Sequence, residues 1–107
     1  MTITTLTDQA EAERLIALPA AWIFKHSRTC SVSAEAMREV EAYLAAHALP
    51  FGLVVVQDQR PLSNWLSTRL GYTHQSPQLF LVGGGAVRWQ ASHWSITAAA
   101  MAAAQTR

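Results

Sequence analysis

Three observations predict that this chain folds as an α/β domain, in which helices flank a four-stranded mixed sheet. A buried strand, an amphipathic helix and a second buried strand follow one another between residues 21 and 58, which is the order of a parallel βαβ unit. Two later strands are separated by only three glycines, so they must pair as an antiparallel hairpin. The 107 residues, half of them apolar, fit a single domain spanning residues 1–107.

The first half of the chain predicts two helices and two strands. Residues 5–18 have the polar start and apolar spacing of a short helix. The apolar run at 21–25 predicts a buried strand. Apolar residues recur every four positions over 30–47, which indicates an amphipathic helix of about four turns. Three consecutive valines within 51–58 predict a strand buried on both faces.

The second half predicts a helix, the hairpin and a final helix. Residues 57–72 form the helix, with Gly71 just past its end. Strands at 79–82 and 86–90 form the hairpin, and the alanine-rich segment 95–105 is the last helix. The complete order is that of the thioredoxin fold, preceded by one additional N-terminal helix.

Charge and composition exclude several classes of function. The formal net charge is +1, which gives no argument for binding nucleic acid or an anionic membrane. The N-terminus lacks the basic start and apolar run of a signal peptide, and no apolar stretch approaches the roughly 20 residues needed to span a bilayer. With one cysteine and no disulfide, we expect a cytoplasmic protein with neither nucleic acid nor membrane as a partner.

The single cysteine, Cys30, lies between a strand and a helix start. The helix dipole and the free N–H groups of a first helical turn favour the thiolate, which is the nucleophile in thiol–disulfide exchange. Lys25, His26 and Arg28 add positive potential in the preceding residues. The alternative is a buried structural cysteine, which is a common fate for this residue.

Ser33 stands three residues after the cysteine, where a dithiol protein would carry its second sulfur. Its hydroxyl can hydrogen-bond the sulfur but cannot attack a mixed disulfide. A single thiol can take up a small thiol from a mixed disulfide and must then wait for an external thiol. The spacing therefore predicts group transfer between thiols, unless Ser33 is an ordinary surface serine of the helix.

Pro77 precedes the third strand. A cis peptide bond is essentially confined to X–Pro, and a cis bond here would leave the backbone of Ser76 free to pair with an extended substrate. A trans proline at a strand start is an equally good interpretation of the sequence.

Histidines at strand ends raise the question of a metal site. His26, His74 and His93 could approach Cys30, and cysteine with histidine can ligate zinc or an iron–sulfur cluster. Their spacing matches no ligand motif, so no metal is predicted.

These features together resemble the YtxJ family, the monothiol bacilliredoxins of bacteria that make bacillithiol. The matching pieces cover about residues 20 to 100 and read "FKHSRTCSVS", "DQRPLSNWL", "HQSPQLFLV" and "ASHWSIT". The family pattern usually has proline and isoleucine after the cysteine, where this chain has Ser31 and Val32. This departure leaves the nucleophile in place.

The resemblance implies an oxidoreductase that removes bacillithiol from S-bacillithiolated proteins. Cys30 would be the nucleophile, Ser33 the non-resolving partner, and Ser76 with Pro77 the substrate ledge. Bacillithiol would be the thiol co-substrate, with no tightly bound cofactor, and bacillithiol or another small thiol would restore the protein. Further candidates for binding the thiol are polar positions: Lys25, His26, Arg28, Arg60, His74, Gln78 and His93.

Two other functions fit the same thiol. Monothiol glutaredoxins with a cysteine–x–x–serine arrangement carry a [2Fe–2S] cluster between two protomers, although their cysteine–glycine–phenylalanine–serine motif is absent here. A binding adaptor that uses the thioredoxin fold without chemistry is the other alternative.

Overall fold

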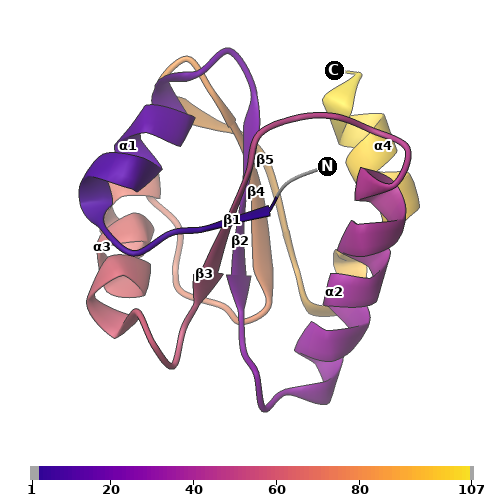
Figure 1. Ribbon diagram of the computed structural model, residues 1–107, viewed down its shortest axis with the longest axis horizontal. Helices are drawn as coiled ribbons and strands as arrows, with labels where there is room; N and C mark the ends of the chain where they lie inside the picture. The colour runs from indigo at the N-terminus through magenta and orange to yellow at the C-terminus, as the bar shows by residue number, and fades with distance from the viewer. Residues whose placement is uncertain (1–2, 107) are drawn as a thin grey trace.

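The computed structural model describes residues 3–106 and shows a mixed sheet covered by helices on both faces (Figure 1). Helices α1 and α3 lie on one face, and α2 and α4 on the other. The strands are β1 (Ile3–Thr5), β2 (Ala21–His26), β3 (Phe51–Val55), β4 (Gln78–Gly83) and β5 (Ala86–Ser92), in the order β1-β3-β2-β4-β5. The helices are α1 (Gln9–Ala17), α2 (Ser31–Leu44), α3 (Arg60–Leu70) and α4 (Ala98–Gln105), with a short 3₁₀ helix, η1 (His93–Ser95), before the last.

The α/β class and the thioredoxin-like order are confirmed, but the predicted number of strands is wrong. The described chain has five strands because β1 pairs in parallel with β3, with Ile3 opposite Phe51. A three-residue strand with one apolar side chain has no periodicity that the sequence could reveal. The prediction therefore left Ile3 and Thr4 unassigned and placed Thr5 at the start of a helix.

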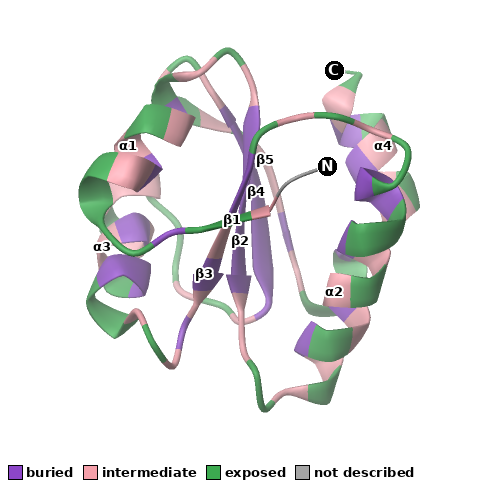
Figure 2. Ribbon diagram, viewed as in Figure 1, coloured by how far each residue is buried: buried purple, intermediate pink, exposed green. Residues whose placement is uncertain are grey.

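Strand β2 is the centre of the sheet, and five of its six residues are buried. It pairs in parallel with β3 and antiparallel with β4. Because side chains alternate along a strand, Trp22 and Phe24 pack toward α2 and α4, whereas Ile23 packs toward α1 and α3. Figure 2 shows the buried residues concentrated in these central strands.

Glycines with positive φ form the C-terminal end of α3 and the turn of the hairpin. Gly71 ends α3 with φ 78°, in the left-handed region that favours glycine, as predicted. Gly84 and Gly85 form the turn between β4 and β5 with φ values of 63° and 94°. Gly83, predicted to be part of this turn, is the last residue of β4.

The topology brings several chain segments to one edge of the sheet. The parallel strands β2 and β3 both end there, and the antiparallel strand β4 begins there. Helix α2 starts at the same edge, after a loop of four residues that follows β2. Cys30 is therefore placed at the sheet edge that β2, β3 and β4 share.

Candidate active site

Cys30 is the N-cap residue of α2 and is partly exposed. Its backbone is extended (φ −106°, ψ 123°), and its carbonyl accepts the first helical hydrogen bond, from Ala34 N at 3.0 Å. The first turn of α2 contains no acidic residue. The sulfur thus lies where the unpaired N–H groups and the dipole of a 14-residue helix favour an anion.

The loop between β2 and Cys30 is held by two side chains from outside it. Ser33 Oγ accepts a hydrogen bond from Ser27 N at 3.0 Å. Gln57, just after β3, accepts from Arg28 N at 3.2 Å and donates to Ser27 Oγ at 2.8 Å and to Thr29 Oγ1 at 3.2 Å. The loop before the thiol is therefore fixed by α2 and by the end of β3.

Gln57 was not among the residues that the sequence singled out. The only signal was its position as the first polar residue after a run of valines, at the end of a strand parallel to β2. That position is shared with many polar loop residues, so it could not identify a partner for the loop 30 residues earlier.

His26 and Ser33 lie together on the α2 side of the sheet. The His26 Nδ1 to Ser33 Oγ distance is 2.7 Å, and Ser33 is fully buried. Burial, with a smaller effect of the nearby Arg28 charge, lowers the pKa of His26 below its ordinary value of 6.5. His26 is therefore a neutral imidazole at pH 7, and it adds no cation beside the sulfur.

Lys25 lies beneath the sheet edge, on the α3 side. It is fully buried, and its Nζ donates to Ser67 Oγ at 2.8 Å and lies 3.3 Å from His74 Nδ1. Burial lowers the pKa of Lys25 from 10.5 to about 8. Its ammonium therefore faces α3 and not an open pocket at Cys30.

His74 completes this buried group. The pKa of His74 is lowered by burial and by the positive charges of Lys25 and Arg60. Because an ammonium has only donors, His74 Nδ1 must accept the hydrogen bond from Lys25. His74 is partly exposed, so it connects the buried lysine with the surface.

The two arginines near the site differ in how their charge is balanced. Arg28 forms an ion pair with Asp58 at 2.5 Å, and both side chains are about half exposed. Asp58 comes from the loop after β3, so it was not visible as a neighbour in the sequence around Cys30. Arg60, the first residue of α3, is exposed at the same edge of the sheet.

Ser76, Pro77 and His93 lie beside the end of β2. The Ser76–Pro77 peptide bond is cis, which is one of the two interpretations left open by the sequence. Lys25 pairs with Gln78 across β2 and β4, so the next position brings Pro77 alongside His26. His93 N donates to Pro77 O at 3.1 Å, and His93 itself is exposed with a φ of 53°.

Gln78 is buried, on the same face of the sheet as Lys25. It accepts from Gln75 N at 3.2 Å and donates to Thr73 O at 3.3 Å, so it supports the segment that carries His74. Its side-chain amide therefore makes hydrogen bonds inside the protein.

The predicted binding residues thus differ in their exposure. Lys25, Ser33 and Gln78 are buried and make internal hydrogen bonds, whereas Arg28, Arg60 and His93 are exposed around the edge; His26 and His74 are partly exposed and also make internal hydrogen bonds.

Within residues 3–106, no three His, Cys, Asp or Glu side chains gather as a metal ion would require, and no helix there has the length and apolar character to cross a membrane.

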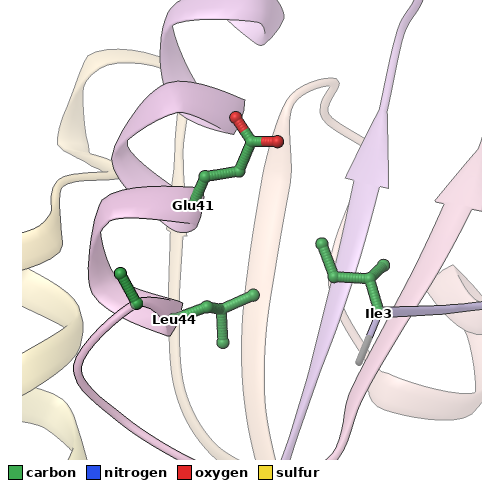
Figure 3. Close-up of a pocket in the computed structure, with 4 residues that line it drawn as sticks. Ile3, Glu41 and Leu44 are labelled. Atoms are coloured by element: carbon green, nitrogen blue, oxygen red, sulfur yellow. The ribbon is translucent and has the colours of Figure 1, made fainter. Parts of the chain in front are cut away.

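A surface pocket lies between β1 and the last turn of α2, lined by Ile3, Glu41 and Leu44 (Figure 3). It is at the opposite end of α2 from Cys30, roughly 20 Å along the helix.

Comparison with known proteins identifies both a family and a fold. A family model described as monothiol bacilliredoxin BrxC matches residues 4–101. A solved structure described as a candidate oxidoreductase with a thioredoxin fold is 27% identical, with a TM-score of 0.91 over 96% of this chain and 93% of that one.

More distant structures show the same fold. The reduced thioredoxin pre-protein of Schistosoma mansoni is 11% identical with a TM-score of 0.77, covering 99% of this chain and 98% of that one. The oxidised thioredoxin of Plasmodium falciparum is 11% identical with a TM-score of 0.75, covering 98% and 97%.

Proposed function

Because the chain belongs to the monothiol bacilliredoxin family, we propose that it removes bacillithiol from S-bacillithiolated proteins through Cys30. The family and the fold both support thiol redox chemistry. The single observation that carries the proposal is the position of the one cysteine: partly exposed, at the N-terminus of α2, with a serine where a second thiol would stand.

The proposed reaction is an exchange of one disulfide for another. The Cys30 thiolate attacks the bacillithiol sulfur of the mixed disulfide, the S–S bond breaks, and the client leaves as a thiolate that takes a proton from water. Cys30 is then joined to bacillithiol. A second small thiol, bacillithiol or another, attacks that bacillithiol sulfur as its thiolate, which releases Cys30 and forms a low-molecular-weight disulfide.

We assign Ser76 and Pro77 as the ledge for the client backbone. They lie alongside the end of β2 that leads to Cys30, and His93 holds this segment through its hydrogen bond to Pro77 O. An extended client segment could pair there with the backbone of Ser76, as in other cases of strand addition.

Bacillithiol carries the carboxylates of its malate group, which need cations. Among the cationic candidates, Arg60 is exposed, whereas Lys25 is buried and Arg28 is paired with Asp58. We therefore propose Arg60 as the first partner of a carboxylate, with His74 and His93 as neighbouring polar groups. No tightly bound cofactor is needed, and the cytoplasm is the compartment that keeps such a thiol reduced.

The test is mass spectrometry after incubation with oxidised bacillithiol at neutral pH. We expect one bacillithiol adduct on Cys30 in the wild-type protein and none in Cys30→Ser. The adduct should disappear when bacillithiol is added in excess, and an S-bacillithiolated client should lose its modification in parallel. A wild-type protein that forms no adduct would refute the proposal.

A further inference from the structure

Ser33 is a buried polar residue that the exchange reaction itself does not use. It is 0% exposed, although it lies only three residues from the partly exposed Cys30. A buried hydroxyl is costly unless it is hydrogen-bonded, so its partners indicate what it does.

As an acceptor, Ser33 Oγ holds the loop before the thiol. It receives the N–H of Ser27 at 3.0 Å, across six residues. Ser27 follows β2 directly, so this bond joins the end of the central strand to the first turn of α2. Cys30 lies between these two anchored points.

As a donor, the hydroxyl has one acceptor among the hydrogen bonds of the described residues, His26 Nδ1 at 2.7 Å. Directing its hydrogen elsewhere would leave a buried donor unsatisfied. The hydroxyl hydrogen therefore points to Nδ1, which must be unprotonated, and the imidazole carries its proton on Nε2. The lowered pKa of His26 agrees with an uncharged ring in this place.

We propose that Ser33 is a positioning residue for Cys30, whose buried hydroxyl fixes the loop through Ser27 and holds His26 as its Nε2–H tautomer. The serine that replaces the second cysteine of a dithiol protein thus has a structural role, which is to hold the loop and His26. A thiol there would be both a weaker donor and a weaker acceptor, so the same position could not serve both functions equally well. The reaction step rests on the proposed function, whereas the hydrogen-bond arrangement does not.

The first readout is the nitrogen NMR signature of the His26 ring. We expect the wild-type protein at pH 7.5 to show the Nε2–H tautomer with a hydrogen-bonded Nδ1, and the Nδ1 resonance to shift in Ser33→Ala because the hydroxyl donor is gone. A wild-type ring protonated on Nδ1 would overturn the proposal, and this measurement needs no variant that folds.

The second readout is the rate at which iodoacetamide alkylates Cys30. We expect Ser33→Ala to react about tenfold more slowly than wild type, because a loop that has lost its buried hydrogen bond holds the sulfur at the N-terminus of α2 for only a small fraction of the time. The matched control is Asp8→Ala, which removes one side-chain cap from α1, on the other face of the sheet, and should keep the wild-type rate. A wild-type rate in Ser33→Ala would overturn the proposal.

A conservative variant separates positioning from simple loss of stability. His26→Leu removes the acceptor and should slow alkylation as Ser33→Ala does. His26→Asn offers a carbonyl oxygen near the place of Nδ1, so it should restore the rate to within about threefold of wild type. If His26→Asn is as slow as His26→Leu, the acceptor role assigned to His26 is wrong.

These outcomes are distinct from those that test the proposed function. A wild-type protein that fails to form a bacillithiol adduct but shows the expected tautomer and alkylation rates would refute the function and leave the role of Ser33 intact.

Discussion

At the scale of single residues, Cys30 lies at the N-terminus of α2, where the helix dipole favours an anion. The three basic residues that precede the cysteine contribute less positive potential there than their sequence positions suggest. Lys25 is buried on the α3 side, His26 is neutral, and Arg28 is paired with Asp58. Spacing along the chain indicated their proximity but not their protonation or their partners.

The Arg28–Asp58 pair can be tested through its effect on anionic substrates. Asp58→Asn frees the arginine charge and should raise the rate of Cys30 with a negatively charged disulfide about two- to threefold at low salt. The gain should fade as ionic strength rises, because both side chains are exposed. Glu13→Gln makes the same charge change at Arg69, between α1 and α3, and should leave the rate as it is.

Lys25 gives the stability of the fold a defined pH dependence. Its pKa is about 8 in the folded protein and 10.5 as the ordinary value, so the unfolded chain binds the proton more tightly. The free energy of unfolding should therefore rise with pH between about 8 and 10.5, and at pH 7 the buried ammonium costs roughly 3 kcal/mol.

Replacing the lysine should remove that cost. We expect Lys25→Met to be more stable than wild type at pH 7, by about 1–2 kcal/mol after the lost hydrogen bonds to Ser67 and His74. The difference between the two proteins should shrink as pH rises from 8 to 10.5 in urea titrations. A variant that is less stable than wild type at pH 7 would contradict this.

At the scale of elements, the end of the hairpin is fixed to α1. Gly84 N donates to Leu18 O at 2.8 Å and Gly85 N to Ile16 O at 2.9 Å. A Cβ atom on Gly83 would come within 2.3 Å of Pro19 O, which is backbone and cannot rotate away. The triple glycine thus serves a close approach as well as a turn.

This close approach predicts the effect of a methyl group. Gly83→Ala should lower the free energy of unfolding by about 1–3 kcal/mol, because β4 and the α1–β2 loop that carries Pro19 must separate slightly. Thermal or urea unfolding measures it, and Cys30 alkylation in the folded variant should be unchanged. An alanine variant as stable as wild type would show that the contact between Gly83 and Pro19 relaxes freely.

The elements themselves could be predicted where the pattern is long. The valines of β3 and the four-residue spacing of α2 gave their elements within a few residues. β1 was missed because three residues carry no period, and its existence depends on pairing with β3, some 48 residues later. The same limit applies to the candidate site. Cys30 and Ser33 belong to one local pattern that the sequence shows, whereas Gln57 and Asp58 reach the loop only through the parallel pairing of β2 and β3.

At the scale of the whole molecule, the sheet separates two clusters of polar side chains, one on each face. The sequence alone does not show which polar residue belongs to which cluster. His26 and Ser33 lie on the α2 face, and Lys25 with Ser67 and His74 lies on the α3 face. The side chains of Lys25 and His26, which are consecutive residues of β2, therefore lie on opposite faces of the sheet. This separation keeps the buried ammonium away from the face on which the helix of the thiol lies.

The outer strand β1 should matter for stability and not for the thiol. A variant lacking residues 1–5 loses the pairing of Ile3–Thr5 with β3 and should be on the order of 2 kcal/mol less stable to urea. Cys30 lies across the sheet at its other end, so the alkylation rate of the folded variant should stay within about twofold of wild type. A large change in that rate would mean that the edge strand influences the site.

Lys25 is the one lysine of the sequence and is enclosed in the central strand of the sheet. A lysine-specific protease therefore has a single cleavage site, and reaching it requires β2 to leave its neighbours. The speed of that one cut reports how often the whole sheet opens, free of the background from loops and frayed ends. A small thiol or client that binds at the edge of the sheet should stabilise the folded state and so slow cleavage after Lys25. Binding could then be detected from the cleavage rate, although the ligand does not contact that peptide bond.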